Sequence, residues 1–386
     1  MGMILTDEQQ AILDGTKGET MAKVMKTLVM FGEAFHAEKM VPVTSRYNHL
    51  VTSFGLGVLQ PVYDLMQQLI DAGAVSGQKF SADPRPLDPN VPANLLQQLV
   101  FKKFMYNKQD FYEGQLEKLG LLNKDAFTCT CYMSEVGNKP EQGEVLSWSE
   151  SSAVVYANSV LGARCNRNSG IMDIMGSIVG YVPYVVGLDK WLGTELDDAA
   201  CTYLKDFGAA TASNGAVGLY HIANLTPEAK AQGEALIAEG ARVYVIDDAE
   251  LQRVKDSYPV VWKNRDAKPK LCFMGCPHMS LEQLKTWTDR VEQALAEAGR
   301  SKVCIPTVFT AAPAVLKEFE KTPYAARLKK TGVITSYICP LMYMNNPLCG
   351  KMPVITSSNK LRTYTTARYY TDDEILVQIT KGGARA

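Results

Sequence analysis

Three cysteines far apart in the sequence each lie near the end of a predicted strand. Cys129 is in FTCTCYM, Cys276 in PKLCFMGCPH and Cys339 in TGVITSYICP. Three thiolates that converge from separate strands suit an iron–sulfur cluster or a single iron ion. Their spacing lacks the paired C-x-x-C pattern of common metal motifs, so the alternative that they are small packed core residues stays open.

Other chemistries find less support in the sequence. No two histidines have a ligand spacing such as H-x-x-x-H, which disfavours zinc. His278 lies two residues after Cys276, so a histidine-assisted thiol nucleophile is a second possibility, weakened by the intervening Pro277. The sequence has no P-loop, no G-x-G-x-x-G after a strand and no G-x-S-x-G elbow, so ATP, NAD and serine-hydrolase functions lose support.

Four polar segments offer groups that bind small anionic or hydroxylated ligands. Freed backbone N–H groups and hydroxyls cradle anions, and lysine or arginine pairs with carboxylates. The alternative for each segment is a helix N-cap or a solvated turn. In chain order the segments carry Thr52 and Ser53; Asp83 and Arg85; Ser149, Glu150, Ser151, Ser152 and Asn158; and Ser357, Ser358, Lys360 and Arg362.

The elements that position the cysteines are clearest after about residue 265. PKLCFMGC predicts a strand, SLEQLKTWTDRVEQALAEAG a helix, SKVCIPTVF a strand, AAPAVLKEFEKT a helix and TGVITSYICP a strand. This alternation predicts a parallel sheet flanked by helices, and ligands collect beyond the carboxyl ends of such strands. Cys276, just after its strand, and Cys339 are therefore expected at that edge.

The first two thirds of the chain predict further helices and short strands. A capping box of Thr6 and Gln9 starts a helix near Asp7, and the patterns at 19–40 and 61–75 predict two more. FTCTCYM is expected to be a strand, and SWSESSAVVYANSV a loop entering a helix of small residues. The longest apolar region, 170–188, is interrupted by charge, proline and glycine, so it predicts buried structure and no spanning helix.

Composition bounds the class of protein. The 386 residues are 46% hydrophobic and 21% charged, with a formal net charge of -1, so nothing favours nucleic acid or a membrane as a partner. Nine scattered cysteines without an export signal favour the cytoplasm. We expect an α/β fold in three parts: an N-terminal segment 1–130, a central domain 131–265 and a C-terminal β-α-β-α-β domain 266–386.

Several stretches together resemble one known family. GEAFHAEKMVPV, EVGNKPEQGEVLSWSESSAVVYANSVLGARCNRNSG, GCPHMSLEQL and ITSSNKLRTY are similar to the catalytic large subunit of the aconitase X family, over about residues 5–380. The resemblance implies an aconitase-like multi-domain body. It implies an iron-dependent dehydratase of a hydroxy acid: cis-3-hydroxy-L-proline, or alternatively mevalonate 5-phosphate.

The resemblance also assigns metal ligands. It implies that Cys129, Cys276 and Cys339 hold a [4Fe–4S] cluster, a [2Fe–2S] cluster or a mononuclear iron, with Cys131 as an alternative to Cys129. An iron with an open position binds hydroxyl and carboxylate oxygens as a Lewis acid, which suits the loss of water from a hydroxy acid.

The resemblance further suggests catalytic and substrate-binding residues. The family lysine matches Lys360, which would stabilise developing enolate charge. Asp83 stands where the family often has asparagine, and its negative charge suits a substrate ammonium better than a phosphate. We predict catalytic roles for Lys360, Ser149 and Glu150, and substrate binding by Val51, Thr52, Ser53, Asp83, Pro84, Ser151, Ser152, Ser357 and Lys360.

A small swivel-domain subunit is expected to complete the enzyme, because in the aconitase pattern the base is a serine on such a domain. The chain is too short to hold that domain beyond the three-domain body. A non-catalytic binding or scaffold subunit remains the alternative from another class.

Overall fold

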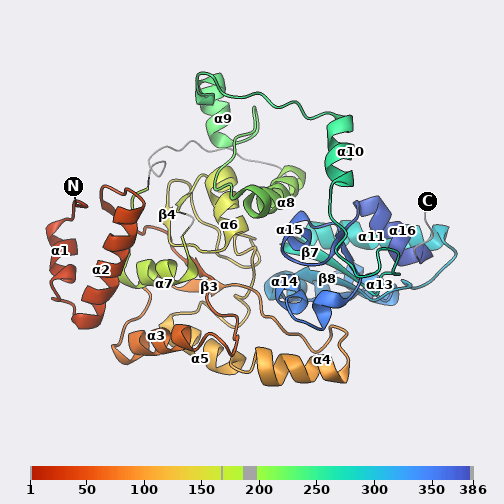
Figure 1. Ribbon diagram of the computed structural model, residues 1–386, viewed down its shortest axis with the longest axis horizontal. Coiled ribbons are helices and arrows are strands. Elements are labelled where there is room, and N and C mark those ends of the chain that lie inside the picture. Colours follow the sequence, from red (N-terminus) through yellow and green to blue (C-terminus); the bar gives the residue numbers. More distant parts are fainter. Residues whose placement is uncertain (1, 167, 186–197, 383–386) are drawn as a thin grey trace.

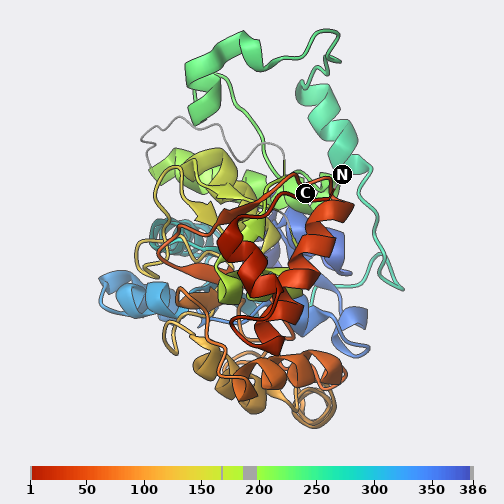
Figure 2. The same cartoon turned by 90° about the vertical axis from the view of Figure 1, so that its left-hand side faces the viewer.

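The computed structural model describes residues 2–166, 168–185 and 198–382. Helices and short strands are interspersed through the described chain, which makes this a mixed α/β fold (Figure 1). The N-terminal helices and the C-terminal sheet lie at opposite ends of the long axis. In both views α9 and α10 stand out from the rest of the body (Figures 1 and 2).

The first part of the chain packs short strands against amphipathic helices. The predicted capping box is confirmed, because the Thr6 hydroxyl accepts from Gln9 N and the Gln9 amide oxygen accepts from Thr6 N. The elements are α1 (Asp7–Leu13), α2 (Glu19–Ala34), β1 (Met40–Pro42), β2 (Asn48–Leu50), α3 (Gln60–Asp71), β3 (Phe80–Ala82), α4 (Leu95–Leu99), a π-helix (Val100–Met105) and α5 (Gln109–Leu119).

The middle of the chain contains a helix of small residues, as predicted from SSAVVYANSV. The apolar region from residue 170 forms buried α7, and its last residues, 186–188, lie outside the described residues. The elements are β4 (Val145–Leu146), α6 (Ser151–Tyr156), a π-helix (Ala157–Leu161), β5 (Arg164–Cys165), α7 (Gly170–Val179), β6 (Tyr181–Pro183), α8 (Asp198–Gly215), α9 (Pro227–Gln232), a 3-10 helix (Gly233–Leu236) and α10 (Asp248–Asp256).

The predicted C-terminal β-α-β-α-β unit is present and belongs to a five-stranded parallel sheet of order β11-β10-β7-β8-β9. Its elements are β7 (Leu271–Met279), α11 (Leu281–Glu297), β8 (Thr307–Ala311), α12 (Pro313–Glu320), α13 (Pro323–Lys330), β9 (Ile334–Ser336), α14 (Pro340–Met344), a 3-10 helix (Cys349–Lys351), β10 (Val354–Thr356), α15 (Asn359–Tyr364), β11 (Arg368–Tyr369) and α16 (Asp372–Lys381).

Both faces of this sheet are buried, which explains its continuous apolar strands. Cys272 and Met274 of β7 pack in a cluster with α11, α12 and α16. The alternate residues, Leu271 and Phe273, pack in a second cluster with α14, α15 and residues from the 91–106 segment. The period of two along β7 therefore assigns successive side chains to opposite layers.

The strand that carries Cys276 extends further than expected. β7 continues through Cys276 to Met279, with a shift in its register against β8. The shift requires glycine, because Gly275 has φ +97° and an added Cβ would lie 2.3 Å from the Thr310 carbonyl oxygen. Such a bulge re-aims the side chains that follow it, and Cys276 is the first of them.

The predicted strand at FTCTCYM is wrong. Only Phe127 makes an isolated parallel bridge, to Ala82, and the residues after it are irregular. The Thr128 hydroxyl accepts from Thr130 N at 3.0 Å and lies 3.1 Å from the Thr130 hydroxyl. These side-chain bonds offer the backbone an alternative to a strand ladder, so the Thr-Cys alternation does not produce a strand.

Two groups of parallel strands end toward one place. β2 pairs with β3, and the residues after them begin the segments at Val51 and at Asp83. The C-terminal sheet contributes the ends of β7, β9 and β10. The domain boundaries at 130/131 and 265/266 stay predictions.

Candidate active site

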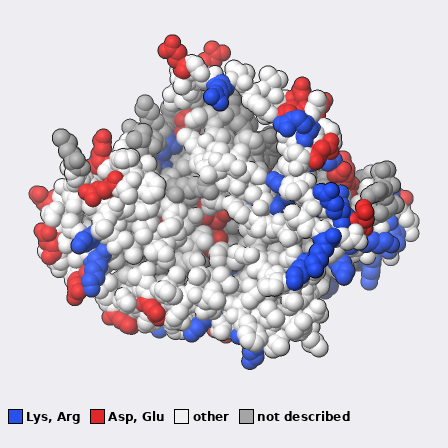
Figure 3. All heavy atoms as spheres, viewed as in Figure 1, with Lys and Arg blue, Asp and Glu red and all other residues white. Residues whose placement is uncertain are grey.

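A cavity of about 380 Å³ lies where these strand ends meet. Figure 3 shows a hollow near the middle of one face, with acidic atoms visible inside it and uncharged residues around it. The residues that line the cavity are Val51, Phe54, Asp83, Pro84, Cys129, Ser149, Glu150, Ser151, Gly275, Cys276, His278, Cys339, Pro340, Leu341, Met342, Asn345, Lys360 and Tyr364.

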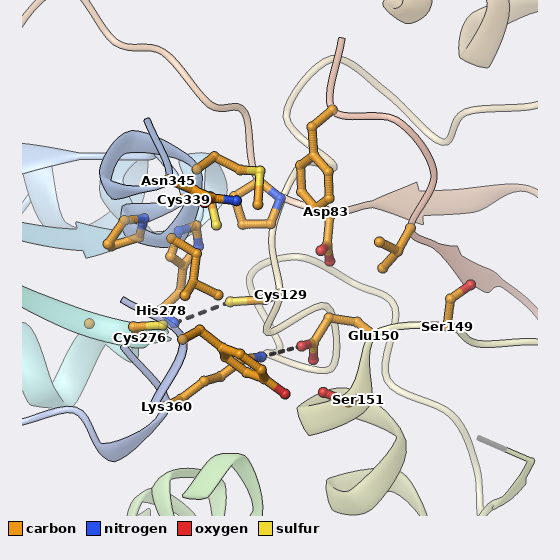
Figure 4. A pocket seen from close by; sticks show the side chains of 18 residues that line it. Asp83, Cys129, Ser149, Glu150, Ser151, Cys276, His278, Cys339, Asn345 and Lys360 are labelled. Carbon is orange, nitrogen blue, oxygen red and sulfur yellow. Dashed lines mark hydrogen bonds and ion pairs between the residues drawn. The ribbon is translucent and has the colours of Figure 1, made fainter. Parts of the chain in front are cut away.

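The three predicted ligand cysteines all line this cavity, from three different segments (Figure 4). Cys129 follows the bridge at Phe127, Cys276 lies in β7, and Cys339 is the N-cap residue of α14. The Cys339 N–H donates to the Arg85 carbonyl at 2.8 Å, which holds it next to the segment that begins at Asp83. Cys131 does not line the cavity and packs in a buried cluster with Trp148.

Burial controls the protonation of these thiols. It raises the pKa of Cys129 and Cys339 far above the usual value for a thiol. It also raises the pKa of Cys276 to about 11, although the nearby Lys360 ammonium acts in the opposite direction. A negative charge on Cys276 further raises the pKa of Cys129 and Cys339, so a bound cation would favour their thiolate forms.

The donor set fits iron. No three His, Cys, Asp or Glu side chains in the described ranges already lie close enough together to form a metal site. The cavity nevertheless receives three sulfur atoms from separate segments, and thiolate is the ligand that iron–sulfur clusters use.

A buried ion pair forms one wall of the cavity. Lys360 Nζ donates to Glu150 Oε1 and, at 3.1 Å, to Ser152 Oγ (Figure 4). Glu150 is the N-cap residue of α6, and its Oε2 accepts from Ala153 N at 2.7 Å and from Ser152 Oγ at 2.5 Å. Burial alone would raise the pKa of Glu150, but Lys360 and these hydrogen bonds hold it below the usual value.

The same pair keeps Lys360 charged. Burial would lower the pKa of the ammonium, but the Glu150 carboxylate outweighs that effect and raises it. Lys360 is the one Lys or Arg side chain that lines the cavity within the described part of the chain. A second buried lysine, Lys205, does not line it and pairs with Asp206 at 2.6 Å.

Asp83 faces the cavity with a histidine behind it. His49 is completely buried, with Nε2 3.4 Å from Asp83 Oδ1 and Nδ1 2.9 Å from the Ser81 hydroxyl. Asn138 Nδ2 donates to Ser81 Oγ at 2.7 Å, which holds the Ser81 hydroxyl beside Nδ1. When His49 is protonated, both ring nitrogens carry hydrogen, and Nε2–H faces Asp83.

Burial and charge shift the pKa values of His49 and Asp83 in opposite directions. Burial lowers the pKa of His49, but the charges of Cys131 and Asp83 raise it to about 10. Burial raises the pKa of Asp83, and His49 partly opposes that rise.

The other predicted substrate residues are placed in two groups. Val51, Pro84, Ser149 and Ser151 line the cavity with the residues above. The Thr52 hydroxyl donates to Tyr112, Ser53 is buried away from the cavity, Ser152 supports Glu150, and Ser357 lines a neighbouring pocket of about 640 Å³. Hydrogen bonds within the fold and burial outside the cavity thus explain why some of the predicted polar residues, such as Thr52 and Ser152, are present.

The structure adds residues that the sequence did not indicate. Phe54, Gly275, Leu341, Met342, Asn345 and Tyr364 line the cavity. Asn345 and the two apolar residues belong to YICPLMYMNNP, directly after Cys339. Their position after a strand end in a parallel sheet was the available signal.

The alternative of a Cys276–His278 thiol nucleophile is wrong. His278 Nδ1 lies 3.0 Å from the Thr128 hydroxyl, and Nε2 lies 3.0 Å from the Ile338 carbonyl. Both ring nitrogens are therefore occupied by groups other than the Cys276 thiol. Burial also lowers the pKa of His278 to about 4, so the ring is neutral and supplies no charge to stabilise a thiolate.

Gly170→Ala is expected to disturb the segment that carries Val51. A Cβ at this position would lie 1.5 Å from the Val51 carbonyl oxygen, which is backbone and cannot rotate away. We expect the variant to raise KM for the substrate, measured by steady-state kinetics. Gly114→Ala on α5, where an added Cβ meets no atom within 4 Å, is the control; an unchanged KM in Gly170→Ala would contradict the expectation.

Comparison with known proteins places this arrangement in a family. The chain matches the aconitase X first domain over residues 2–189 and the aconitase X second domain over residues 171–256. The phosphomevalonate dehydratase large subunit of Thermococcus kodakarensis is 28% identical over 353 residues, which cover 81% of this chain and 82% of that protein. The cis-3-hydroxy-L-proline dehydratase of Hypocrea jecorina is 29% identical over 206 residues, 41% of this chain and 33% of that protein.

The fold agrees with these matches. The crystal structure of aconitase X from Thermococcus kodakaraensis in its holo form has a TM-score of 0.74, with 22% sequence identity, and covers 98% of this chain and 100% of that one. The family models account for most of the first two thirds of the sequence, and the structural match extends over nearly all of it. The chain therefore belongs to the aconitase X family of hydro-lyases.

Proposed function

We propose that the chain is the large subunit of an iron-dependent dehydratase that removes water from cis-3-hydroxy-L-proline. The observation that carries the choice of substrate is the charge of the cavity. The described lining residues supply one ammonium, Lys360, and two carboxyl groups, Asp83 and Glu150. Glu150 already pairs with Lys360, whereas Asp83 lies near His49 only through Oδ1, so the other oxygen of the Asp83 carboxylate remains for a positive group on the ligand.

A zwitterionic hydroxy amino acid matches this arrangement. Its carboxylate pairs with Lys360, and its ring ammonium pairs with Asp83. Lys360 has three N–H donors, and two of them bond to Glu150 and Ser152, so the third is available to the substrate carboxylate. As the α-proton leaves, charge grows on that carboxylate, and the fixed ammonium stabilises it.

Cys129, Cys276 and Cys339 would hold the iron as a cluster or a single ion. When bound, iron supplies a Lewis acid for the departing hydroxyl and the carboxylate. Glu150 keeps Lys360 charged and oriented. Ser149 lines the cavity, and its hydroxyl lies beside the buried Asp173 carboxyl, so its predicted catalytic role requires the side chain to turn toward the substrate.

A small subunit would supply the base and close the site. The relative from Thermococcus kodakarensis is named a large subunit, which supports a two-subunit enzyme. All nine cysteines are free thiols, which supports the reducing cytoplasm as the location. No helix in the described ranges is long and apolar enough to cross a bilayer.

Mevalonate 5-phosphate is the second candidate substrate. The match to a phosphomevalonate dehydratase covers twice as much of this chain as the match to the Hypocrea enzyme, 81% against 41%. Against it, the described cavity lining contains no arginine, and Asp83 would repel the phosphate. The family membership argues against the non-catalytic scaffold.

Turnover of both substrates by the iron-loaded two-subunit enzyme tests the proposal. We expect water loss from cis-3-hydroxy-L-proline. Asp83→Asn should lower kcat/KM for it by roughly 10–100-fold, the value of one buried hydrogen bond to a charged group. Iron content should not change in this variant, and Asp64→Asn on α3 serves as the control.

The possible contrary results separate the parts of the proposal. Turnover of mevalonate 5-phosphate alone would overturn the substrate assignment and keep the dehydratase. If the enzyme turned over neither compound, the proposed dehydratase activity would be wrong for both substrates. Full activity of Asp83→Asn would remove the role of Asp83.

A further inference from the structure

His278 joins the three segments that carry the ligand cysteines. Its Nδ1 is 3.0 Å from the hydroxyl of Thr128, the residue before Cys129. Its Nε2 is 3.0 Å from the carbonyl oxygen of Ile338, the residue before Cys339. His278 itself lies two residues after Cys276 in β7.

A third bond reaches a sulfur atom directly. The backbone N–H of His278 donates to Cys129 Sγ at 3.4 Å (Figure 4). The partners of His278 lie 150, 60 and 149 residues away in the sequence, so no local element can hold these segments together.

The burial of His278 makes these bonds persistent. The side chain is completely buried, as is the Thr128 side chain. A buried donor or acceptor that loses its partner cannot turn to water, so each bond resists opening. The carbonyl of Ile338 can only accept, so Nε2 carries a proton, and Thr128 can donate its hydroxyl hydrogen to Nδ1.

We propose that His278 is a positioning residue that sets the spacing of Cys129, Cys276 and Cys339 for iron. This inference rests on the proposed function, because it takes these cysteines as the ligands. The imidazole does not coordinate iron. It fixes the backbone beside two ligands from a position on the strand of the third. The backbone N–H of His278, which the imidazole holds in place, donates to the Cys129 sulfur.

The chemistry of other metal sites gives the expected size. Groups that hydrogen-bond to metal ligands and orient them typically contribute to metal affinity, which falls by roughly 10–100-fold when such a group is removed. Hydrogen bonds to ligand sulfurs also tune iron–sulfur centres. Removal of the imidazole should therefore weaken iron binding while all three cysteines remain.

The test compares iron affinity with folding stability in the full chain. Iron affinity is measured anaerobically by competition with a chelator, well below the unfolding temperature of the metal-free protein, which is measured separately. His278→Leu should weaken iron binding by roughly 10–100-fold. Thr128→Val, which keeps the shape and removes the hydroxyl, should weaken it less, and Thr128→Ser should restore wild-type affinity.

Controls make the result specific. His221→Gln changes a partly exposed histidine outside the cavity and should bind iron like the wild type. If His278→Leu does not fold, Thr128→Val and Thr128→Ser carry the test alone. A lower unfolding temperature with unchanged iron affinity in the folded variants would show a structural role only and overturn the inference.

The failure of this inference differs from the failure of the proposed function. If the wild type binds iron, Cys276→Ser does not, and the His278 and Thr128 variants match the wild type, then only the positioning role is wrong. If the wild type binds no iron, the proposed function fails and this inference fails with it.

Discussion

Cys276→Ser should abolish iron binding and lower turnover roughly a thousandfold or more. Cys276 lies on the bulged part of β7 and lines the cavity with Cys129 and Cys339. A serine hydroxyl is a poor ligand for an iron centre that selects soft thiolates. Loss of the Lewis acid removes several kcal/mol of transition-state stabilisation, and each 1.36 kcal/mol is about tenfold in rate.

Two other cysteines supply the controls for this variant. Cys131→Ala removes a buried thiol two residues from Cys129 that does not line the cavity, and Cys304→Ser changes a partly exposed thiol. Both should keep iron, measured as iron per chain after anaerobic reconstitution. Iron retained by Cys276→Ser, or lost from Cys131→Ala but not from a Cys129 variant, would show that the ligand set is wrong.

Lys360→Met should abolish activity and also destabilise the fold. The change leaves the Glu150 carboxylate buried without its partner, and breaking one side of a buried pair costs about 3–5 kcal/mol. Loss of the only cation that lines the cavity in the described chain should lower kcat by roughly 10²–10³-fold, as for other preorganised donors. Urea unfolding measures the first effect and steady-state kinetics the second.

A double variant separates these two effects. Glu150→Gln added to Lys360→Met removes the unpaired carboxylate, so stability should partly return while activity stays lost. Lys285→Met, which breaks an exposed pair with Glu282, should cost less than about 1 kcal/mol. If Lys360→Met alone were as stable and as active as the wild type, the ion pair would have neither role.

The C-terminal β-α-β-α-β unit was the most predictable part of the fold. Its strands and helices have strong periodicity, and Ser280 and Gln283 form a capping box that marks the start of α11. A parallel sheet is enough to predict that Cys276 and Cys339 lie at the same edge, beyond the carboxyl ends of their strands. The bulge after Met274 was not predictable, because it depends on the approach of the Thr310 carbonyl to Gly275.

The segment around Cys129 was less predictable, for a physical reason. Thr and Cys alternate there as in a strand, but contacts distant in sequence, such as Thr128 with His278, fix an irregular path. The same limit applies to the choice between Cys129 and Cys131. Both fit the sequence pattern, and only tertiary packing places one at the cavity and the other in the core.

The polar segments show how far composition can assign a role. Glu150 is a helix N-cap that also lines the cavity, and its catalytic role stays a prediction. Ser152 and Thr52 satisfy neighbouring groups instead of facing the cavity. His49 gave no sequence signal, because its importance comes from its place behind Asp83.

The most direct test of the account is a crystal structure of the anaerobically reconstituted protein, with diffraction recorded on both sides of the iron absorption edge. The account predicts an iron signal inside the cavity, bound by the sulfur atoms of Cys129, Cys276 and Cys339. An iron signal elsewhere, or three unligated thiols in protein that is active as a dehydratase, would contradict it.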